Sequence, residues 1–197
     1  MTIHFMISTI SDQYIKKTLT LAEQRRGFCA PNPAVGAVVV KNEKIIGSGA
    51  HQQCGEPHAE VLALQAAGEA ARGATLYVSL EPCCHWGRTP PCSELIIQSG
   101  ISAVYYAYRD PNPAVAGQGA EKLRAAGIDC HYVAMPEADD FYASYYYWTE
   151  HHRPRVTAKI ALSLDSKIAG VNGQPLTITG VPLQQYTHHG RQHSDAL

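Results

Sequence analysis

The sequence predicts an α/β fold, a three-layer α/β/α sandwich around a mixed sheet. Two apolar segments, residues 35–40 and 44–50, flank a short polar turn, which is typical of an antiparallel hairpin. After this hairpin, strand-like segments alternate with helix-like segments along the chain. Such alternation favours parallel strands with helices on both faces of the sheet, and together the two patterns indicate a mixed sheet.

Each expected element has a local signal. Ser11 or Asp12 can cap a first helix that runs to about Arg26. Gly100 is expected to end a helix that begins at Ser93. The other expected helices are residues 59–71, 119–127 and 136–148, of which the last begins with proline and acidic residues, as helix N-termini prefer. The other expected strands are residues 75–80, 103–108 and 128–134.

A change of composition at residues 151–155, HHRPR, divides the chain. We expect one domain over residues 1–150. Residues 156–164 predict a new strand, followed by a polar stretch to Leu197. Because this tail is too short to bury a core of its own, we expect residues 151–197 to open a second domain or to be an appendage of the first.

The bulk composition favours a globular protein that has no nucleic-acid or membrane partner. Apolar residues make up 45% of the chain and charged residues 17%, which argues against disorder. The formal net charge is −1, and no run of Lys or Arg supplies a basic surface. The apolar runs are far too short to cross a bilayer, and the N-terminus does not read as a signal peptide. The cysteines are expected to be reduced thiols, so we expect a cytoplasmic enzyme.

Two segments carry the residue types of a zinc site, PHAEVLAL from Pro57 and EPCCHWGRTPPC from Glu81. One histidine and two thiolates make a three-ligand set that leaves the fourth tetrahedral position for water, as in catalytic zinc sites. A carboxylate beside an activated water can accept its proton and deliver it to a leaving group, and Glu60 is the candidate. His58 and Glu60 can share a site only if the N-terminus of their helix faces the metal, because residues two apart within a helix point in different directions.

The pattern H-x-E followed by P-C-x-x-C is the signature of zinc deaminases, and this chain departs from it at one position. Trp86 stands where the second cysteine of C-x-x-C is expected, so Cys92 is the candidate third ligand in a longer C-x8-C spacing. An extended loop must then fold back to close the site. Cys84 adjoins Cys83 and is an alternative ligand, but Cys83 is favoured because it follows the strand and Pro82 directly.

Four segments, PNPAVGAVVV, GSGAHQQCGEPHAEVLAL, TLYVSLEPCCHWGRTPPC and RDPNPAVAGQG, closely resemble the deaminase half of the bifunctional riboflavin-biosynthesis deaminase–reductase family. The resemblance covers nearly all of residues 10–150. It implies a cytidine-deaminase-like fold and hydrolytic removal of the 2-amino group from 2,5-diamino-6-(5-phosphoribosylamino)pyrimidin-4-one. The products implied are 5-amino-6-(5-phosphoribosylamino)uracil and ammonia.

The resemblance also implies roles for individual residues. It implies the zinc ligands His58, Cys83 and Cys92, with Glu60 as the proton shuttle. The substrate contacts that it implies are Asn32, His51, His85, Arg88, Asp110 and Asn112. Arg88 and the pair Asp110 and Asn112 of DPNP can also be interpreted from the residues alone. The guanidinium of Arg88 suits the phosphate of a phosphoribosyl substrate, whereas DPNP is also good turn chemistry.

Residues 156–180 resemble the first strands of the NADPH-dependent reductase domain of the same family. Lys159 lies where that domain carries a lysine, but Ser166 and Thr177 depart from its usual pattern. NADPH is expected as a cofactor only for a complete reductase domain, so we expect no reductase activity from this chain. The sequence leaves the oligomeric state open, a homo-oligomer included.

Two other functions compete with this one. Deamination of cytidine or of adenosine in tRNA uses the same zinc and glutamate chemistry, but the long loop and the lack of a basic surface speak against it. A non-catalytic structural zinc module predicts a closed site with Cys84 or His85 as the fourth ligand. The aromatic cluster at residues 142–148 is expected to pack at a domain or subunit junction rather than to stack bases.

Overall fold

The computed structural model describes residues 2–192 and 194. The chain divides into two compact units, Met1–Pro154 and Arg155–Leu197, which are described separately below. None of the helices in the described part of the chain combines the length and the hydropathy that a membrane span requires.

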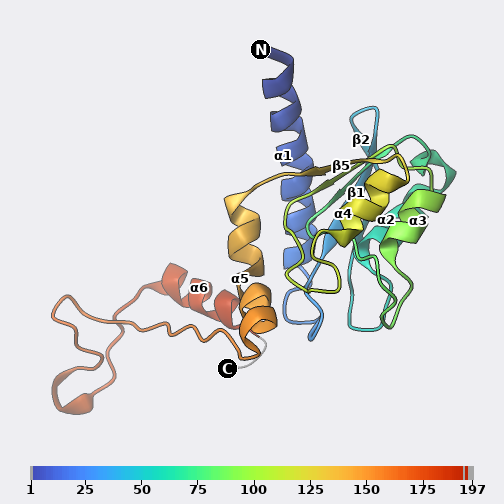
Figure 1. The fold of residues 1–197 in the computed structure, drawn as a ribbon. Helices are drawn as coiled ribbons and strands as arrows, with labels where there is room; N and C mark the ends of the chain where they lie inside the picture. Colours follow the sequence, from blue (N-terminus) through green and yellow to red (C-terminus); the bar gives the residue numbers. More distant parts are fainter. Residues whose placement is uncertain (1, 193, 195–197) are drawn as a thin grey trace. The chain divides into compact units, whose positions relative to one another are not determined.

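The first unit is built on a five-stranded mixed sheet (Figure 1). The strand order is β2-β1-β3-β4-β5, in which β1 is antiparallel to β2 and β3, and the remaining neighbours are parallel. The strands are β1 (Gly36–Lys41), β2 (Lys44–Ala50), β3 (Thr75–Val78), β4 (Ala103–Tyr106) and β5 (Asp129–Tyr132). The helices of this unit are α1 (Thr2–Glu23), α2 (Ala59–Ala67), the short 3-10 helix Gly68–Ala71, α3 (Cys92–Gln98), α4 (Gln118–Ala125) and α5 (Pro136–His151).

The predicted hairpin and the predicted three layers are confirmed. Asn42 and Glu43 connect β1 to β2 with positive φ angles of 50° and 60°, as a tight two-residue hairpin turn requires. Alternate residues of the strands belong to two separate hydrophobic cores, one on each face of the sheet. Val39 belongs to the core formed with α2 and α3, and its neighbour Val38 belongs to the core formed with α1 and α5. Figure 1 shows α2, α3 and α4 on one face of the sheet and α1 and α5 on the other.

Two glycines of β2 let helix α2 lie unusually close to the sheet. A Cβ atom at Gly49 would lie 2.5 Å from the carbonyl oxygen of Ala59, and one at Gly47 would lie 2.2 Å from that of Ala63. Such distances are shorter than van der Waals contact, so only glycine fits at these positions. The close contact fixes the N-terminus of α2, where His58 and Glu60 lie, against the end of β2.

Two expected helix boundaries were wrong. Helix α1 begins at Thr2 rather than at Ser11 or Asp12. Ser11 does not cap the helix because its side chain is buried and hydrogen-bonded to Tyr77 of the sheet. The expected helix over residues 59–71 ends at Ala67, because Gly68 takes a positive φ of 56° and the chain continues as a single 3-10 turn.

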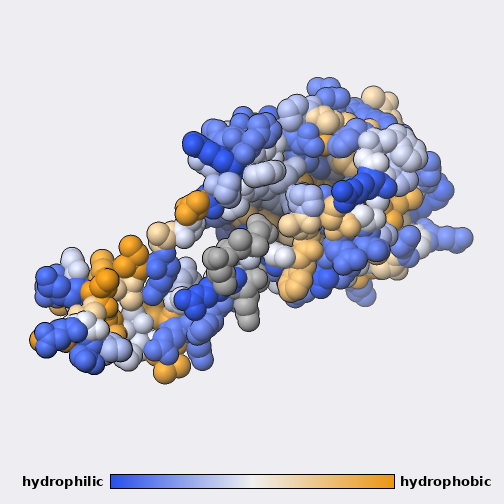
Figure 2. Space-filling view, turned by 90° about the horizontal axis from the view of Figure 1, so that it is seen from below, coloured by the Kyte–Doolittle hydropathy of each residue, from blue (hydrophilic) through white to orange (hydrophobic). Residues whose placement is uncertain are grey.

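The second unit contains the 3-10 turn Val171–Gly173 and helix α6 (Val181–Gln192). The strand expected over residues 156–164 is not formed, and this expectation was wrong. A strand needs a partner to pair its backbone groups, and the described part of this unit supplies no second strand. Figure 2 shows hydrophobic side chains at the surface of this unit, and Val156 and Ile160 are 85% and 66% exposed.

Candidate metal centre and adjoining cavity

Four loops meet at one end of the sheet and bring the candidate site residues together. The register pairs Gly36 of β1 with Ala50 of β2, so the loop before β1 and the loop after β2 lie at the same edge. Ala37 pairs with Val78, which places the loop after β3 at this edge as well. Because β4 is parallel to β3, the loop after β4 also begins there. The carboxyl ends of neighbouring parallel strands commonly form such sites.

His58, Cys83 and Cys92 form the metal centre at this edge. One ligand atom from each residue lies within 4.8 Å of the other two. His58 directly precedes α2, Cys83 lies in the loop after β3, and Cys92 is the first residue of α3. A nitrogen and two sulfurs at these separations fit a tetrahedral zinc ion with one open position. Zinc is therefore the metal that the donor set supports, and the predicted preference for Cys83 over Cys84 is confirmed.

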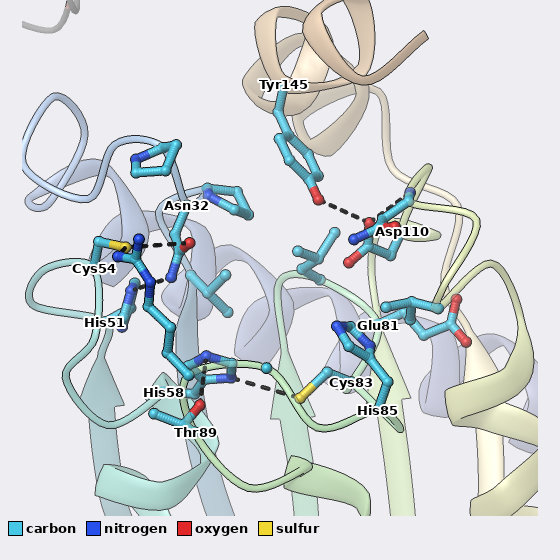
Figure 3. A pocket seen from close by; sticks show the side chains of 18 of the residues that line it. Asn32, His51, Cys54, His58, Glu81, Cys83, His85, Thr89, Asp110 and Tyr145 are labelled. Carbon is cyan, nitrogen blue, oxygen red and sulfur yellow. Dashed lines mark hydrogen bonds between the residues drawn. The ribbon is translucent and has the colours of Figure 1, made fainter.

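The ring of His58 presents a different nitrogen to each side (Figure 3). Its Nδ1 lies 3.2 Å from Sγ of Cys92 and 3.6 Å from Sγ of Cys83, so Nδ1 is the atom that faces the metal position. Its Nε2 lies 3.2 Å from Oγ1 of Thr89, which belongs to the long loop between the two cysteines. The second nitrogen of a metal-binding histidine commonly has such a partner, which fixes the ring and its tautomer.

The first turn of α3 stabilises negative charge on Cys83. The backbone N–H of Cys92 donates to Sγ of Cys83 at 3.3 Å. Hydrogen bonds from the Cys92 thiol and from His58 lower the pKa of the Cys83 thiol to about 4, against the opposing effect of burial. The Cys92 thiol keeps its proton when it donates to Cys83, which raises the pKa of Cys92 well above its usual value. The site thus readily provides a thiolate, the form that binds zinc.

Glu60 lies in the first turn of α2, beside the metal centre. As the H-x-E spacing required, the helix points its N-terminus at the site. The side chain is buried, with 4% of its surface exposed, and burial raises the pKa of its carboxyl to about 7. It is also a hydrogen-bond partner of Cys92. A carboxyl group with a pKa near neutrality can both accept and donate a proton.

A cavity of about 290 Å³ opens onto the metal centre. Its lining includes His58, Cys83 and Glu60. The six residues for which the sequence predicts substrate contacts also line it: Asn32, His51, His85, Arg88, Asp110 and Asn112. The structure therefore brings every predicted site residue to one place, with Cys92 buried directly behind the wall.

On one side of the cavity, His51 and Asn32 orient each other. Nδ1 of His51 lies 3.1 Å from the carbonyl oxygen of Pro57, so this nitrogen carries the proton and donates. Nε2 then accepts from Nδ2 of Asn32 at 3.1 Å. Burial lowers the pKa of His51, which favours the neutral ring that this pattern needs. The carbonyl oxygen of Asn32 is thereby turned away from His51, toward the thiol of Cys54.

On the opposite side, Asp110 lies under helix α5 (Figure 3). Its Oδ1 accepts the backbone N–H of Asn112 at 2.9 Å and the hydroxyl of Tyr145 at 3.0 Å. Asn112 accepts the backbone N–H of Ala114 at 3.1 Å. The DPNP segment therefore does form the turn that its composition indicates, and it also presents two polar side chains to the cavity.

The long loop between Cys83 and Cys92 contributes His85, Gly87, Arg88 and Thr89 to the lining of the cavity. Nη1 of Arg88 donates to Sγ of Cys54 at 2.7 Å, and both residues line the cavity. Nδ1 of His85 is buried and has no hydrogen-bond partner among the described residues, so it can take one from a ligand. Trp86 points outward and is 71% exposed. Cys84 contacts the carbonyl oxygen of Ala114 and is not part of the metal cluster.

Several residues that line the cavity were missed in the sequence. Thr89 and Cys54 lie in loops without a recognisable motif, and Tyr145 lies in the aromatic cluster that was interpreted as packing. Glu81 is buried, and its carboxylate accepts the N–H groups of Gly117 and Ala120 at 3.1 Å each, so it caps helix α4. The only feature of the sequence that pointed to Glu81 was its place as an acidic residue directly after an expected strand.

Comparison with known proteins supports the same family. Residues 9–108 match the family model described as the cytidine and deoxycytidylate deaminase zinc-binding region. The chain is 48% identical over 193 residues to the riboflavin biosynthesis protein RibD of Aquifex aeolicus, and 44% identical over 190 residues to RibD of Synechocystis. These matches cover 98% and 95% of this chain but 54% and 52% of the relatives, so the chain spans about half their length.

A solved structure supports the fold as well. The diaminohydroxyphosphoribosylaminopyrimidine deaminase/5-amino-6-(5-phosphoribosylamino)uracil reductase of Thermotoga maritima superposes with a TM-score of 0.86 at 41% identity. The superposition covers 93% of this chain and 53% of that protein. The predicted resemblance and the cytidine-deaminase-like fold are thus confirmed. The chain belongs to the cytidine and deoxycytidylate deaminase family, as a RibD-like member of it.

Proposed function

We propose that residues 1–150 catalyse the hydrolytic deamination of 2,5-diamino-6-(5-phosphoribosylamino)pyrimidin-4-one. The products are 5-amino-6-(5-phosphoribosylamino)uracil and ammonia, a step of riboflavin biosynthesis. The observation that carries this proposal is the convergence of Glu60, the zinc ligands and six polar side chains on a single cavity. The name of the Thermotoga maritima protein supports the choice of substrate, and the name of the Aquifex aeolicus relative supports the pathway.

Glu60 carries out the proton transfers in this proposal. Zinc, when bound, supplies the Lewis acid that makes water nucleophilic near neutral pH. Glu60 accepts the proton of the attacking water as the C–O bond forms at C2 of the pyrimidine, and passes it to the ring nitrogen whose double bond to C2 opens. It then transfers the proton of the new C2 hydroxyl to the 2-amino nitrogen, so that the C2 carbonyl forms, the C–N bond breaks and ammonia leaves. Its burial beside the metal centre, with a pKa of about 7, suits both transfers.

The other side chains of the cavity bind the rest of the substrate. Asn32 is held by His51 with its amide at the cavity wall, where it can read a ring or sugar edge. Asp110 and Asn112 offer acceptors and donors for the ring and sugar from the opposite wall. Arg88 and His85 bind the phosphate, because both line the cavity and a planar guanidinium can bond two phosphate oxygens.

Residues 151–197 are proposed to be the opening segment of a dihydrofolate-reductase-like domain. Their resemblance to the start of the reductase half supports this, as does the reductase in the name of the Thermotoga maritima protein. NADPH reduction is assigned only to a complete domain, and the role of Lys159 belongs to it. All six cysteines are free thiols, which supports a reducing, cytoplasmic location.

Ammonia release from a panel of substrates tests the proposed function. The panel contains the phosphoribosyl diaminopyrimidine, cytidine, deoxycytidylate and a tRNA with adenosine in the anticodon loop. We expect the zinc-loaded protein to release ammonia from the first compound and not from the others. Release from cytidine, deoxycytidylate or tRNA with none from the diaminopyrimidine contradicts the proposed substrate. No release from any of them supports a non-catalytic zinc module instead.

A further inference from the structure

We propose that Tyr145 of helix α5 is a positioning residue for the substrate. It acts by holding the carboxylate of Asp110 so that one oxygen faces the cavity. The inference rests on the proposed function, in which Asp110 contacts the ring or sugar. It also makes α5 part of the deaminase pocket rather than only a packing helix.

The hydrogen bonds at Asp110 are uneven. Both the hydroxyl of Tyr145, at 3.0 Å, and the backbone N–H of Asn112, at 2.9 Å, go to the same oxygen, Oδ1. Two donors on one oxygen fix the rotation of the carboxylate and leave Oδ2 as an acceptor for a ligand. Asp110 and Tyr145 both line the cavity, so a substrate hydroxyl or ring N–H that donates to Oδ2 of Asp110 lies within the cavity.

Helix α5 is itself fixed to the sheet one turn before Tyr145. Tyr142 is fully buried, and its hydroxyl donates to the carbonyl oxygen of Ala34 at 3.1 Å. The hydroxyl oxygen of Tyr142 is also 2.7 Å from Oγ of Ser79, which accepts the backbone N–H of Gly36 at 3.0 Å. Residues three apart share a helix face, so this anchor also sets the position of Tyr145.

The electrostatics of Asp110 give the hydrogen bond a measurable effect. Burial raises the pKa of Asp110, whereas the hydrogen bonds from Asn112 and Tyr145 lower it. The other titratable groups facing it are Glu81 and Cys83 after β3, Tyr142 of α5 and Tyr108 after β4.

Loss of the Tyr145 hydroxyl removes a hydrogen bond that favours the charged form, so the pKa of Asp110 rises further. As the pH falls, the carboxylate is then protonated at a higher pH than in the unchanged protein. As the pH is lowered, substrate binding through Asp110 should therefore begin to weaken at a higher pH in the variant than in the unchanged protein.

Steady-state deamination of the phosphoribosyl diaminopyrimidine by Tyr145→Phe tests the proposal. We expect KM to rise about 10-fold, the order for one hydrogen bond to a charged group, while kcat changes little. We also expect the acid limb of the kcat/KM profile to move to higher pH. Tyr146→Phe is the matched control, because Tyr146 lies on the same helix and is 46% exposed. It should leave KM and the profile unchanged.

A double-mutant cycle with Asp110→Asn shows whether Tyr145 acts through Asp110. If it does, Tyr145→Phe adds little to the KM of the Asp110→Asn protein. Additive effects, or a Tyr145→Phe protein with unchanged KM and pH profile, would overturn the inference while leaving the proposed function intact. An unchanged protein that does not deaminate this substrate would overturn both.

Discussion

Oγ1 of Thr89 lies 3.2 Å from Nε2 of His58, while Nδ1 of the same ring faces the sulfurs of Cys83 and Cys92. With Nδ1 turned to the metal, the neutral ring carries its proton on Nε2 and donates it to the threonine hydroxyl. The long C-x8-C loop therefore does more than connect two ligands. It places the hydroxyl of Thr89 beside His58, the third ligand, and so holds the imidazole ring in place.

Thr89→Val is expected to weaken zinc binding by about 10- to 100-fold, because such second partners of metal ligands have effects of this order. Valine keeps the shape of threonine and removes only the acceptor. The zinc dissociation constant can be measured by competition with a chromophoric chelator. Thr89→Ser retains the hydroxyl and should bind zinc nearly as well as the unchanged protein. Unaltered affinity in the valine variant would show that this hydrogen bond does not support the ligand.

Adjacent cysteines should differ sharply in their contribution to zinc binding. Cys83→Ser removes a ligand, so we expect the purified protein to lose most of its zinc after dialysis. Cys84→Ser changes a thiol outside the cluster that contacts the carbonyl oxygen of Ala114, so we expect a full complement of zinc. Metal analysis of the two variants provides the comparison. Zinc loss from the Cys84 variant alone would reverse the ligand assignment.

Gly49→Ala is expected to displace the N-terminus of α2, and with it His58 and Glu60 of the metal centre, from strand β2. The added Cβ would lie 2.5 Å from the carbonyl oxygen of Ala59, between His58 and Glu60 in the sequence. Helix α2 must move away, which we expect to lower the free energy of unfolding by about 1–3 kcal/mol and to weaken zinc binding. Urea denaturation and chelator competition measure the two effects.

Gly87→Ala is the control for this change, because a Cβ there meets nothing within 4 Å. It should leave the free energy of unfolding nearly unchanged. If Gly49→Ala were as stable as this control and bound zinc equally well, close contact between β2 and α2 would not be what positions the ligands.

The zinc ligands could be predicted from the sequence because their chemistry is local to two short segments. His58 and Glu60 stand at a helix start, and Cys83 and Cys92 bound one loop, so no knowledge of distant contacts was needed. The alternation of strands and helices likewise predicted the mixed sheet. Its order, however, places β1 between β2 and β3, and this depends on pairing across the chain.

Residues that act through distant contacts could not be predicted. Tyr145 reaches Asp110 across 35 positions of sequence, and nothing in a helix rich in tyrosine distinguishes this ring from its neighbours. Ser11 is a residue type that commonly caps helices, but its side chain forms a hydrogen bond with Tyr77 of the sheet instead. Residues 156–164 have the composition of a strand, yet pairing depends on a partner that the local sequence does not specify.

The most direct test of the central claim is the deaminase activity of Glu60→Gln, measured together with its zinc content. Glutamine keeps the size of the side chain and removes its ability to exchange a proton. We expect kcat for ammonia release from the phosphoribosyl diaminopyrimidine to fall by about 10²- to 10⁴-fold while zinc stays bound. Turnover at the rate of the unchanged protein, with zinc retained, would contradict the assignment of Glu60 as the proton shuttle.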